Sequence, residues 1–222
     1  MRVLHTCHSN AIEGNTLTLS ETKRVLSTGI TIGGKTLREH LETTNNAQGY
    51  DLIVRLAREQ APITHITIQQ VHEVVTRGIL LYAGCYRTHN VRITGAVRSP
   101  PDGKKIIPEM DRLIQEIAQH DRPVIEMTAY LHHRFVLIHP FTDGNGRVAR
   151  LSGNLYLIRN GFPRSFSPTR RGNSITRHSV RQITAIYPHS SCSLHTPQTK
   201  RSPIFYRFSG IGKPSSHSVN LP

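Results

Sequence analysis

The sequence predicts an all-α domain over residues 1–163, interrupted by one short strand-like segment, and a tail of different composition over residues 164–222. Three observations support this organisation. Apolar residues recur at helical spacing in most segments of the domain, Ser20 stands where a helix cap is expected, and every Asp and Glu falls within the domain. A domain of this length is within the usual range.

The first part of the domain is expected to form successive helices. Ser9 and Glu13 are four residues apart, which places a hydroxyl and a carboxylate on one helical face, ahead of Gly14 as a stop. Ser20 is the expected cap of the next helix. Further helix signals follow at residues 37–42, 51–59 and 69–81.

Residues 86–107 are expected to form a hairpin, because residues 86–93 are strand-like and a turn-rich run follows at residues 99–105. Two helices joined by a loop come next, since apolar residues again recur at helical spacing. These residues are Met127, Tyr130, Leu131, Phe135 and Ile138, and then Val148, Leu151, Leu155 and Ile158.

The loop between these two helices carries a run of twelve residues, His-Pro-Phe-Thr-Asp-Gly-Asn-Gly-Arg-Val-Ala-Arg. His139 can take a hydroxyl proton near neutral pH, and Asp143 offers a hard oxygen ligand for Mg²⁺. The backbone of Gly144–Gly146 can turn successive N–H groups toward one anion, and a helix N-terminus behind it adds its dipole. Arg147 and Arg150 can neutralise phosphate oxygens. The set suits the handling of a nucleotide phosphate.

Residues 139–150 resemble the signature of the Fic family, His-x-Phe-x-(Asp/Glu)-Gly-Asn-Gly-Arg-x-x-Arg, at every fixed position. The resemblance implies a mostly helical fold and a protein adenylyltransferase, a nucleotidyltransferase that moves AMP from ATP to a Ser, Thr or Tyr hydroxyl of a target protein. It implies that His139 is the general base and that Asp143 binds the Mg²⁺ that bridges the α and β phosphates. Relatives resembling Doc, which phosphorylate instead, depart from the Gly-Asn-Gly-Arg pattern. The nucleotide-binding residues that the resemblance implies are Gly144, Asn145, Gly146, Arg147 and Arg150.

Residues 1–16 resemble the inhibitory segment of the same family, (Ser/Thr)-x-x-x-Glu-(Gly/Asn), through Ser9, Glu13 and Gly14. The resemblance implies that Glu13 pairs with Arg150 and blocks productive binding of the γ phosphate, so that the enzyme is autoinhibited. In members that run in reverse, the same glutamate aligns a water that removes AMP.

Residues 86–107 resemble the Fic flap, a hairpin that clamps an extended segment of the target beside the active site. Arg92 and Ile93 are then the expected target-binding residues of the flap. A plain surface hairpin with a cationic rim is the alternative interpretation. The sequence does not identify the target, the dominant direction of the reaction, or whether a homodimer regulates it.

A competing motif occurs at residues 29–36, Gly-Ile-Thr-Ile-Gly-Gly-Lys-Thr, which fit the P-loop pattern. A P-loop follows a buried strand and opens a helix, whereas residues 20–26 carry helical spacing. We therefore expect Lys35 on a surface loop, and a P-loop NTPase that uses Lys35 is the alternative function.

Three cysteines, Cys7, Cys85 and Cys192, are odd in number and lack metal-site spacing, which suits free thiols in a reducing cytoplasm. No hydrophobic run approaches about 18 residues and no signal peptide is evident. Neither a membrane nor secretion is therefore indicated, and a cytoplasmic location is expected.

The tail at residues 164–222 contains nine Lys or Arg and no acidic residue, so the formal charge is +5 for residues 1–163 and +9 for the tail. A disordered basic tail is the favoured interpretation over nucleic-acid binding, because its Lys and Arg residues are scattered.

The resemblance stops near Pro163, where the family continues with a helix that helps to wall the adenine pocket. We hypothesise a frameshift there, which would impair adenine binding. An inactive Fic remnant with a nucleic-acid-binding tail is the corresponding alternative, and the N-terminus is expected to be short.

Overall fold

The computed structural model describes residues 1–93, 99–119 and 121–165. Within these residues the chain forms seven α-helices and one short 3-10 helix and no strand, which confirms the predicted all-α class. The elements are α1 (Arg2–Ile12), α2 (Leu19–Thr28), α3 (Leu37–Arg58), α4 (His65–Thr76), η1 (Gly103–Lys105), α5 (Ile106–Gln119), α6 (Val124–Ile138) and α7 (Asn145–Arg159).

Threonine capping boxes start three of these helices. At α2 the Thr18 side chain accepts a hydrogen bond from the Glu21 backbone N–H at 3.2 Å, and the Glu21 carboxylate accepts one from the Thr18 N–H at 2.7 Å. Thr36 and Thr64 begin α3 and α4 in the same way. The expected cap at Ser20 is therefore wrong, because Ser20 lies inside α2 and the reciprocal pair requires Thr18 with a glutamate three residues later.

The boundaries of two helices also differ from the sequence prediction. The signals at residues 37–42 and 51–59 belong to one helix, α3, which is 22 residues long. Helix α4 ends at Thr76 and not near residue 81, because Gly78 adopts a left-handed backbone with φ +69°. Such a conformation is favourable for glycine and ends the helical path.

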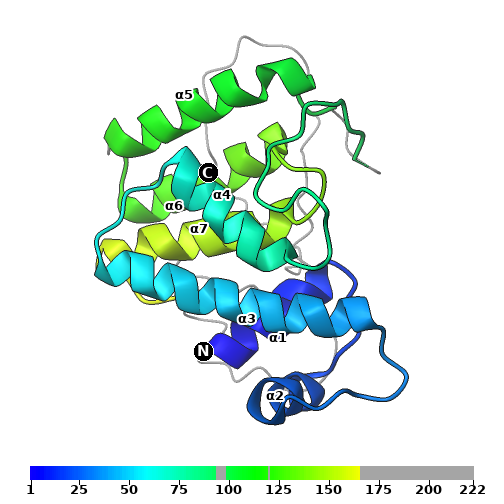
Figure 1. Cartoon of the computed structure of the whole chain (residues 1–222). Helices are drawn as coiled ribbons and strands as arrows, with labels where there is room; N and C mark the ends of the chain where they lie inside the picture. Colours follow the sequence, from blue (N-terminus) through cyan, green and yellow to red (C-terminus); the bar gives the residue numbers. More distant parts are fainter. Residues whose placement is uncertain (94–98, 120, 166–222) are drawn as a thin grey trace, which may run out of the picture.

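The central element of the fold is α7, which packs against α6, α3 and α4 (Figure 1). Eleven of its 15 residues are buried. Close packing with α3 depends on Gly49, because a side-chain Cβ there would stand 3.0 Å from both Leu151 and Val75. Helix α5 packs on α6 at one end of the molecule, and α1 and α2 pack on α3 at the other. This arrangement brings α1 against α7, although they are far apart in the sequence.

The expected hairpin at residues 86–107 is not formed in the described part of that segment. Residues 86–93 contain no strand, and the returning half is η1 followed by the start of α5. The reason is that the polar groups bond elsewhere: the Arg87 N–H donates to the Pro140 carbonyl, and the Gly103 N–H donates to the Asn90 side chain. Residues 94–98, at the centre of the expected flap, lie outside the described residues.

The segment at residues 29–36 does not have the context of a P-loop. It follows helix α2 and not a strand, and it leads into α3. Lys35 is half-buried, and its ammonium donates hydrogen bonds to the Thr16 carbonyl at 3.0 Å and to the Thr16 hydroxyl at 2.9 Å. The expected place of Lys35 on a surface loop between helices is confirmed.

Arg164 and Ser165 are the described start of the expected tail. The Ser165 N–H donates to the Asn154 side chain at 2.8 Å, and the Arg164 guanidinium lies over the Tyr50 ring. These two residues therefore pack on α7 and α3. The remainder of the tail, residues 166–222, and with it the consequence of a frameshift, lies outside the described residues.

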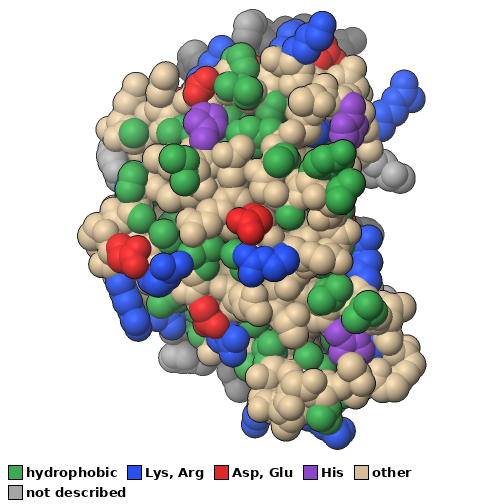
Figure 2. All heavy atoms as spheres, in the orientation of Figure 1, with side chains coloured by type: hydrophobic (Ala, Val, Ile, Leu, Met, Phe, Trp, Pro, Cys, Tyr) green, Lys and Arg blue, Asp and Glu red, His purple; other side chains and the backbone are tan. Residues whose placement is uncertain are grey.

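The surface of the described residues mixes charges of both signs, and acidic and basic side chains lie beside one another in Figure 2. Cys7 and Cys85 are free thiols, as expected, whereas Cys192 falls outside the described part of the chain. None of the helices that the structure describes is both long and apolar enough to span a bilayer.

Candidate active site

The run at residues 139–150 forms the connection from α6 to α7 and the first turns of α7. His139 ends α6 with a left-handed backbone (φ +52°), and Gly144 precedes α7 in the same region (φ +78°). Gly144 is the one member of the Gly-Asn-Gly turn with positive φ, because Asn145 and Gly146 already belong to α7. The N-terminus of α7 therefore points into the loop, where its free N–H groups and dipole favour an anion.

The Asn145 side chain closes this loop. Its amide Nδ2 donates to the Phe141 carbonyl at 2.8 Å, and its Oδ1 accepts from the Phe141 N–H at 2.9 Å. Asn145 is buried and both ends of its amide are used in this way. The side chain of Asn145 therefore fixes the shape of the loop. Only the backbone of Asn145 is left to bind a nucleotide.

His139 is arranged as a proton acceptor. Its Nδ1 lies 3.4 Å from the Val136 carbonyl oxygen, which can only accept, so the proton is assigned to Nδ1 and Nε2 keeps its lone pair. Burial lowers the pKa of His139 from its ordinary value of 6.5, and the nearby Arg87 guanidinium acts in the same direction. A neutral imidazole is the form needed for a general base.

Arg87 ties residues 86–89 to the loop. Its guanidinium donates to the carbonyls of His139 at 2.8 Å, His89 at 2.7 Å and Pro101 at 2.7 Å. Arg87 is buried, and these carbonyls satisfy the charge without a carboxylate. Arg87, at the start of the expected flap, thus fixes the backbone carbonyl of His139, which has a left-handed conformation.

His72 of α4 supports the other end of the loop. Its ring stacks on Phe141, with centroids 3.6 Å apart and an angle of 2° between the planes. The Gly84 N–H donates to His72 Nδ1 at 2.9 Å, so the ring proton is on Nε2, which donates to the Asp143 carbonyl at 3.1 Å. His72 therefore fixes the backbone of the Asp143–Gly144 peptide.

Replacing His72 by Phe is expected to lower the free energy of unfolding by about 1–3 kcal/mol, because stacking persists while Gly84 N–H and Asp143 C=O lose their partner. Urea unfolding measures the change. His65→Phe is a matched control, since the His65 side chain is partly exposed and water can replace its partners. Equal loss in both variants would contradict a special role for His72.

Asp143 belongs to a cluster of two carboxylates and two guanidiniums. Arg38 donates to Asp143 Oδ2 at 2.6 Å and to Glu42 Oε1 at 3.1 Å. Arg147 lies 3.7 Å from Asp143 and 3.8 Å from Glu42 with its side chain 1 % exposed. Within the described residues no hydrogen-bond partner reaches Arg147 Nε or Nη1. Buried donors without a partner are costly, and an anionic ligand would satisfy them.

Asp143 is also the expected Mg²⁺ ligand. Among the residues that the structure describes, no group of three or more His, Cys, Asp or Glu is placed to hold a metal ion. A Mg²⁺ ion here would complete its ligand shell with water oxygens, and with phosphate oxygens when a nucleotide is bound, in addition to the carboxylate of Asp143. The Arg147 guanidinium lies beside Asp143, and its Nε and Nη1 have no hydrogen-bond partner among the described residues, so this guanidinium fits such a phosphate.

Arg150 meets the end of α1. Its Nη2 donates to Glu13 Oε1 at 2.6 Å and to the Ser9 carbonyl at 2.9 Å, and its Nε donates to the Ser9 hydroxyl at 2.9 Å. Gly14 follows with φ +97°, so the predicted stop is confirmed. A Cβ at Gly146 would collide with the Glu13 carboxylate. Glu13 therefore lies over the first turn of α7, where an anion is favoured.

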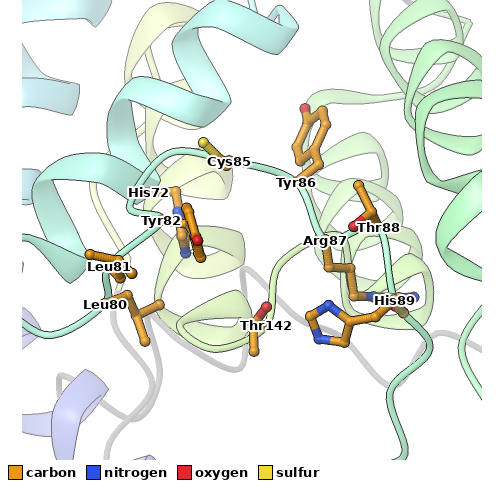
Figure 3. Close-up of a pocket in the computed structure, with 10 residues that line it drawn as sticks. All are labelled: His72, Leu80, Leu81, Tyr82, Cys85, Tyr86, Arg87, Thr88, His89 and Thr142. Carbon is orange, nitrogen blue, oxygen red and sulfur yellow. Dashed lines mark hydrogen bonds between the residues drawn. The ribbon is translucent and has the colours of Figure 1, made fainter.

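A cavity of about 390 Å³ adjoins the loop. Figure 3 shows Leu80, Leu81 and Tyr82 on one side of it and Arg87 and His89 on the other, with Thr142 of the loop between them. Leu81 and Tyr82 are largely exposed. The expected target-binding residues Arg92 and Ile93 follow in the chain, the first exposed and the second half-buried.

Comparison with known proteins agrees with this geometry. The profile of the Fic/DOC family matches residues 62–157. The chain is 38 % identical over 168 residues to protein adenylyltransferase Fic of Nematostella vectensis, an alignment that covers 72 % of this chain and 38 % of the relative. It is 36 % identical over 171 residues to protein adenylyltransferase fic-1 of Caenorhabditis elegans, covering 72 % of this chain and 32 % of the relative.

Solved structures give the same result. A Fic domain-containing signaling protein from Bacteroides thetaiotaomicron superposes with a TM-score of 0.70 at 30 % identity, covering 75 % of this chain and 66 % of that one. Fic-1 from C. elegans superposes with a TM-score of 0.65 at 33 % identity, covering 75 % of this chain and 50 % of that one.

The chain belongs to the Fic/DOC family. It spans about a third of the length of the two curated relatives. Within this Fic fold the structure brings together the predicted site residues of α1, the loop and α7. Sequence reasoning missed four residues of the site: Arg38, Glu42, His72 and Arg87. The sequence around Arg87, or around His72 inside its helix, gives no local signal of a role in the site. The reason is that each of these residues bonds to a loop far along the chain.

Proposed function

We propose that this Fic protein transfers AMP from ATP to a hydroxyl side chain of a target protein. The observation that carries the proposal is the pairing of a free imidazole nitrogen on His139 with the N-terminus of α7 and the unpartnered donors of Arg147. Relatives named protein adenylyltransferase support the same reaction.

The reaction follows from the positions of these groups. The target hydroxyl attacks the α phosphorus, His139 Nε2 takes its proton, and the bond to the bridging oxygen breaks as pyrophosphate leaves. Backbone N–H groups of Gly144–Gly146 and the Arg147 guanidinium stabilise the charge on the phosphate oxygens. Asp143 would hold a Mg²⁺ ion together with phosphate oxygens, and this ion would supply further charge neutralisation.

Glu13 acts as a brake in this proposal. Its carboxylate takes one Nη2 hydrogen bond of Arg150 and covers the start of α7 at Gly146. Arg150 is then not free to hold the γ phosphate, and a second anion in the same place would be repelled. The same carboxylate is placed to hold a water for removal of AMP, and release of label from pre-labelled target tests that direction.

The target is proposed to be a protein that presents its hydroxyl on an extended segment. The cavity beside Thr142, with Leu81 and Tyr82 exposed at its edge, supports contact with an apolar residue near that hydroxyl. Arg92 and Ile93 are proposed to contact the same segment.

Incubation with Mg²⁺ and ATP labelled at the α or the γ phosphate tests the reaction. We expect protein labelling from α-labelled ATP alone, first on the Fic chain itself and then on proteins of an added lysate. Label from γ-labelled ATP would show phosphorylation instead, and absence of both in the Glu13→Gly variant would overturn the proposal.

The rate of AMP transfer is expected to fall on the acid side with an apparent pKa below 6.5, because burial lowers the pKa of His139 and the neutral form is the base. As pH decreases through that value, His139 becomes protonated and can no longer accept the hydroxyl proton. Initial rates of labelling are measured from about pH 4.5 to about pH 8, roughly the range around an ordinary histidine pKa. The midpoint is the pH at which the rate is half of its maximum. A midpoint above 6.5 would contradict the assignment of the base.

A further inference from the structure

Arg38 is an exposed residue that contacts the carboxylate of Asp143. It lies in the first turn of α3 (Leu37–Arg58), and its side chain is 57 % exposed. Its Nη2 donates to Asp143 Oδ2 at 2.6 Å, and its Nε donates to Glu42 Oε1 at 3.1 Å. The second oxygen of Asp143 accepts from the Gly144 N–H at 2.5 Å. Both oxygens of this carboxylate therefore already have donors.

The position of Arg38 is not explained by helix stability. The first turn of a helix carries positive partial charge, so a guanidinium there is disfavoured by the dipole, unlike Glu39 in the same turn. The carboxylates of Glu42 and Asp143 are what hold Arg38. Arg38 and Asp143 are 105 positions apart, so tertiary packing alone creates this contact.

A divalent cation at Asp143 and the Arg38 guanidinium compete for one oxygen. Mg²⁺ binds carboxylate oxygens at about 2.0–2.1 Å and tolerates little distortion of its ligand shell. A guanidinium on the same oxygen would add repulsion between two cations a few ångströms apart. Because Arg38 is exposed and also anchored to Glu42, it can release Asp143 without any change in the core.

We propose that Arg38 is a resident competitor of the divalent cation at Asp143 and raises the concentration of cation that the site requires. This inference rests on the proposed nucleotide site. It adds to that proposal the residue that sets the Mg²⁺ concentration at which the site is filled. Arg38 gives up Asp143 when the cation binds and keeps its contact with Glu42.

Calorimetric titration of ADP at a series of free Mg²⁺ concentrations tests the proposal without any group transfer. The midpoint is the Mg²⁺ concentration at which half of the gain in ADP affinity is reached. We expect Arg38→Ala to lower this midpoint about fivefold, the upper range for an exposed ion pair. Arg112→Ala is the matched control, because Arg112 forms an exposed pair with Glu109 on the distant α5 and should leave the midpoint unchanged.

Equal midpoints in wild type and Arg38→Ala would overturn the proposal. Weaker ADP binding in Arg38→Ala at every Mg²⁺ concentration, with an unchanged midpoint, would place Arg38 on the phosphates and would also overturn it. Retained Mg²⁺ dependence in Asp143→Asn would show that the cation binds elsewhere, which removes the basis of the competition.

A second arm separates this inference from the proposed function. Binding of Mn²⁺ to the nucleotide-free protein is followed by the loss of the electron paramagnetic resonance signal of the free ion. We expect Arg38→Ala to bind Mn²⁺ about fivefold more tightly than wild type, and Asp143→Asn to lose this binding. If ADP does not bind at all, the proposed function fails while the Mn²⁺ result still decides the role of Arg38. Absence of Asp143-dependent Mn²⁺ binding in Arg38→Ala overturns the inference.

Discussion

His139→Ala is expected to reduce AMP transfer by about 10²- to 10⁴-fold, the usual contribution of a positioned general base. Among the described residues its side chain makes one hydrogen bond, from Nδ1 to the Val136 carbonyl, and its Nε2 is available for the hydroxyl proton. Nothing in the described structure links the imidazole to the groups proposed to hold phosphate. ATP affinity, measured by calorimetry, should therefore stay within about threefold of the starting protein, a change below 1 kcal/mol.

Lys35→Ala is the control for the competing interpretation. Lys35 is half-buried and its ammonium is already bonded to Thr16, so its removal should leave ATP turnover nearly unchanged. Label transfer from α-labelled ATP is measured for both variants in the Glu13→Gly background. Loss of turnover in Lys35→Ala together with activity in His139→Ala would establish the P-loop interpretation and sink the present one.

Glu13→Gly is expected to raise self-labelling by about tenfold or more, because a charge-assisted hydrogen bond of roughly 1.5–3 kcal/mol no longer holds Arg150 away from the γ phosphate. The bond to be removed is the 2.6 Å contact from Arg150 Nη2 to Glu13 Oε1. Glycine also suits the end of α1, where Glu13 is the last residue before Gly14. Removing the carboxylate uncovers Gly146 at the start of α7 as well.

The combination of Glu13→Gly with Arg150→Ala distinguishes release of Arg150 from a general loosening of α1. The double variant should lose the gain, since the freed guanidinium is the group that binds phosphate. Glu59→Gly is the matched control, because Glu59 is also an exposed glutamate at the end of a helix, α3. This variant should show the same self-labelling as wild type. Equal labelling of wild type and Glu13→Gly, in folded and active protein, would rule out Glu13 as the brake.

Much of the chemistry was predictable from local sequence. The run from His139 to Arg150 combines a proton acceptor, a carboxylate and two guanidiniums in twelve residues, and the structure places this run at one junction of α6 and α7. The pair Ser9 and Glu13 shares one helical face because the helical repeat dictates it. The structure adds that both contact Arg150.

The strand prediction at residues 86–93 shows why local pattern was insufficient elsewhere. Strand preference depends on the partner that a segment finds, and here the Arg87 N–H finds the Pro140 carbonyl instead of a neighbouring strand. The same holds for Asn145: the sequence predicted a role for its backbone, whereas the bonds of its side chain to the backbone of Phe141 appear only in the structure.

The sequence by itself determined most of the helices, the loop and the identity of the candidate reactive groups, because each depends on residues within a few positions of one another. Tertiary structure alone decided how these groups are held and balanced. Arg87 on His139, His72 on Asp143 and Arg38 on Asp143 join residues that are 52, 71 and 105 positions apart. Such contacts follow from the packing of α3, α4 and α6 around α7, which no local period encodes, and they fix the backbone and the charge balance of the site.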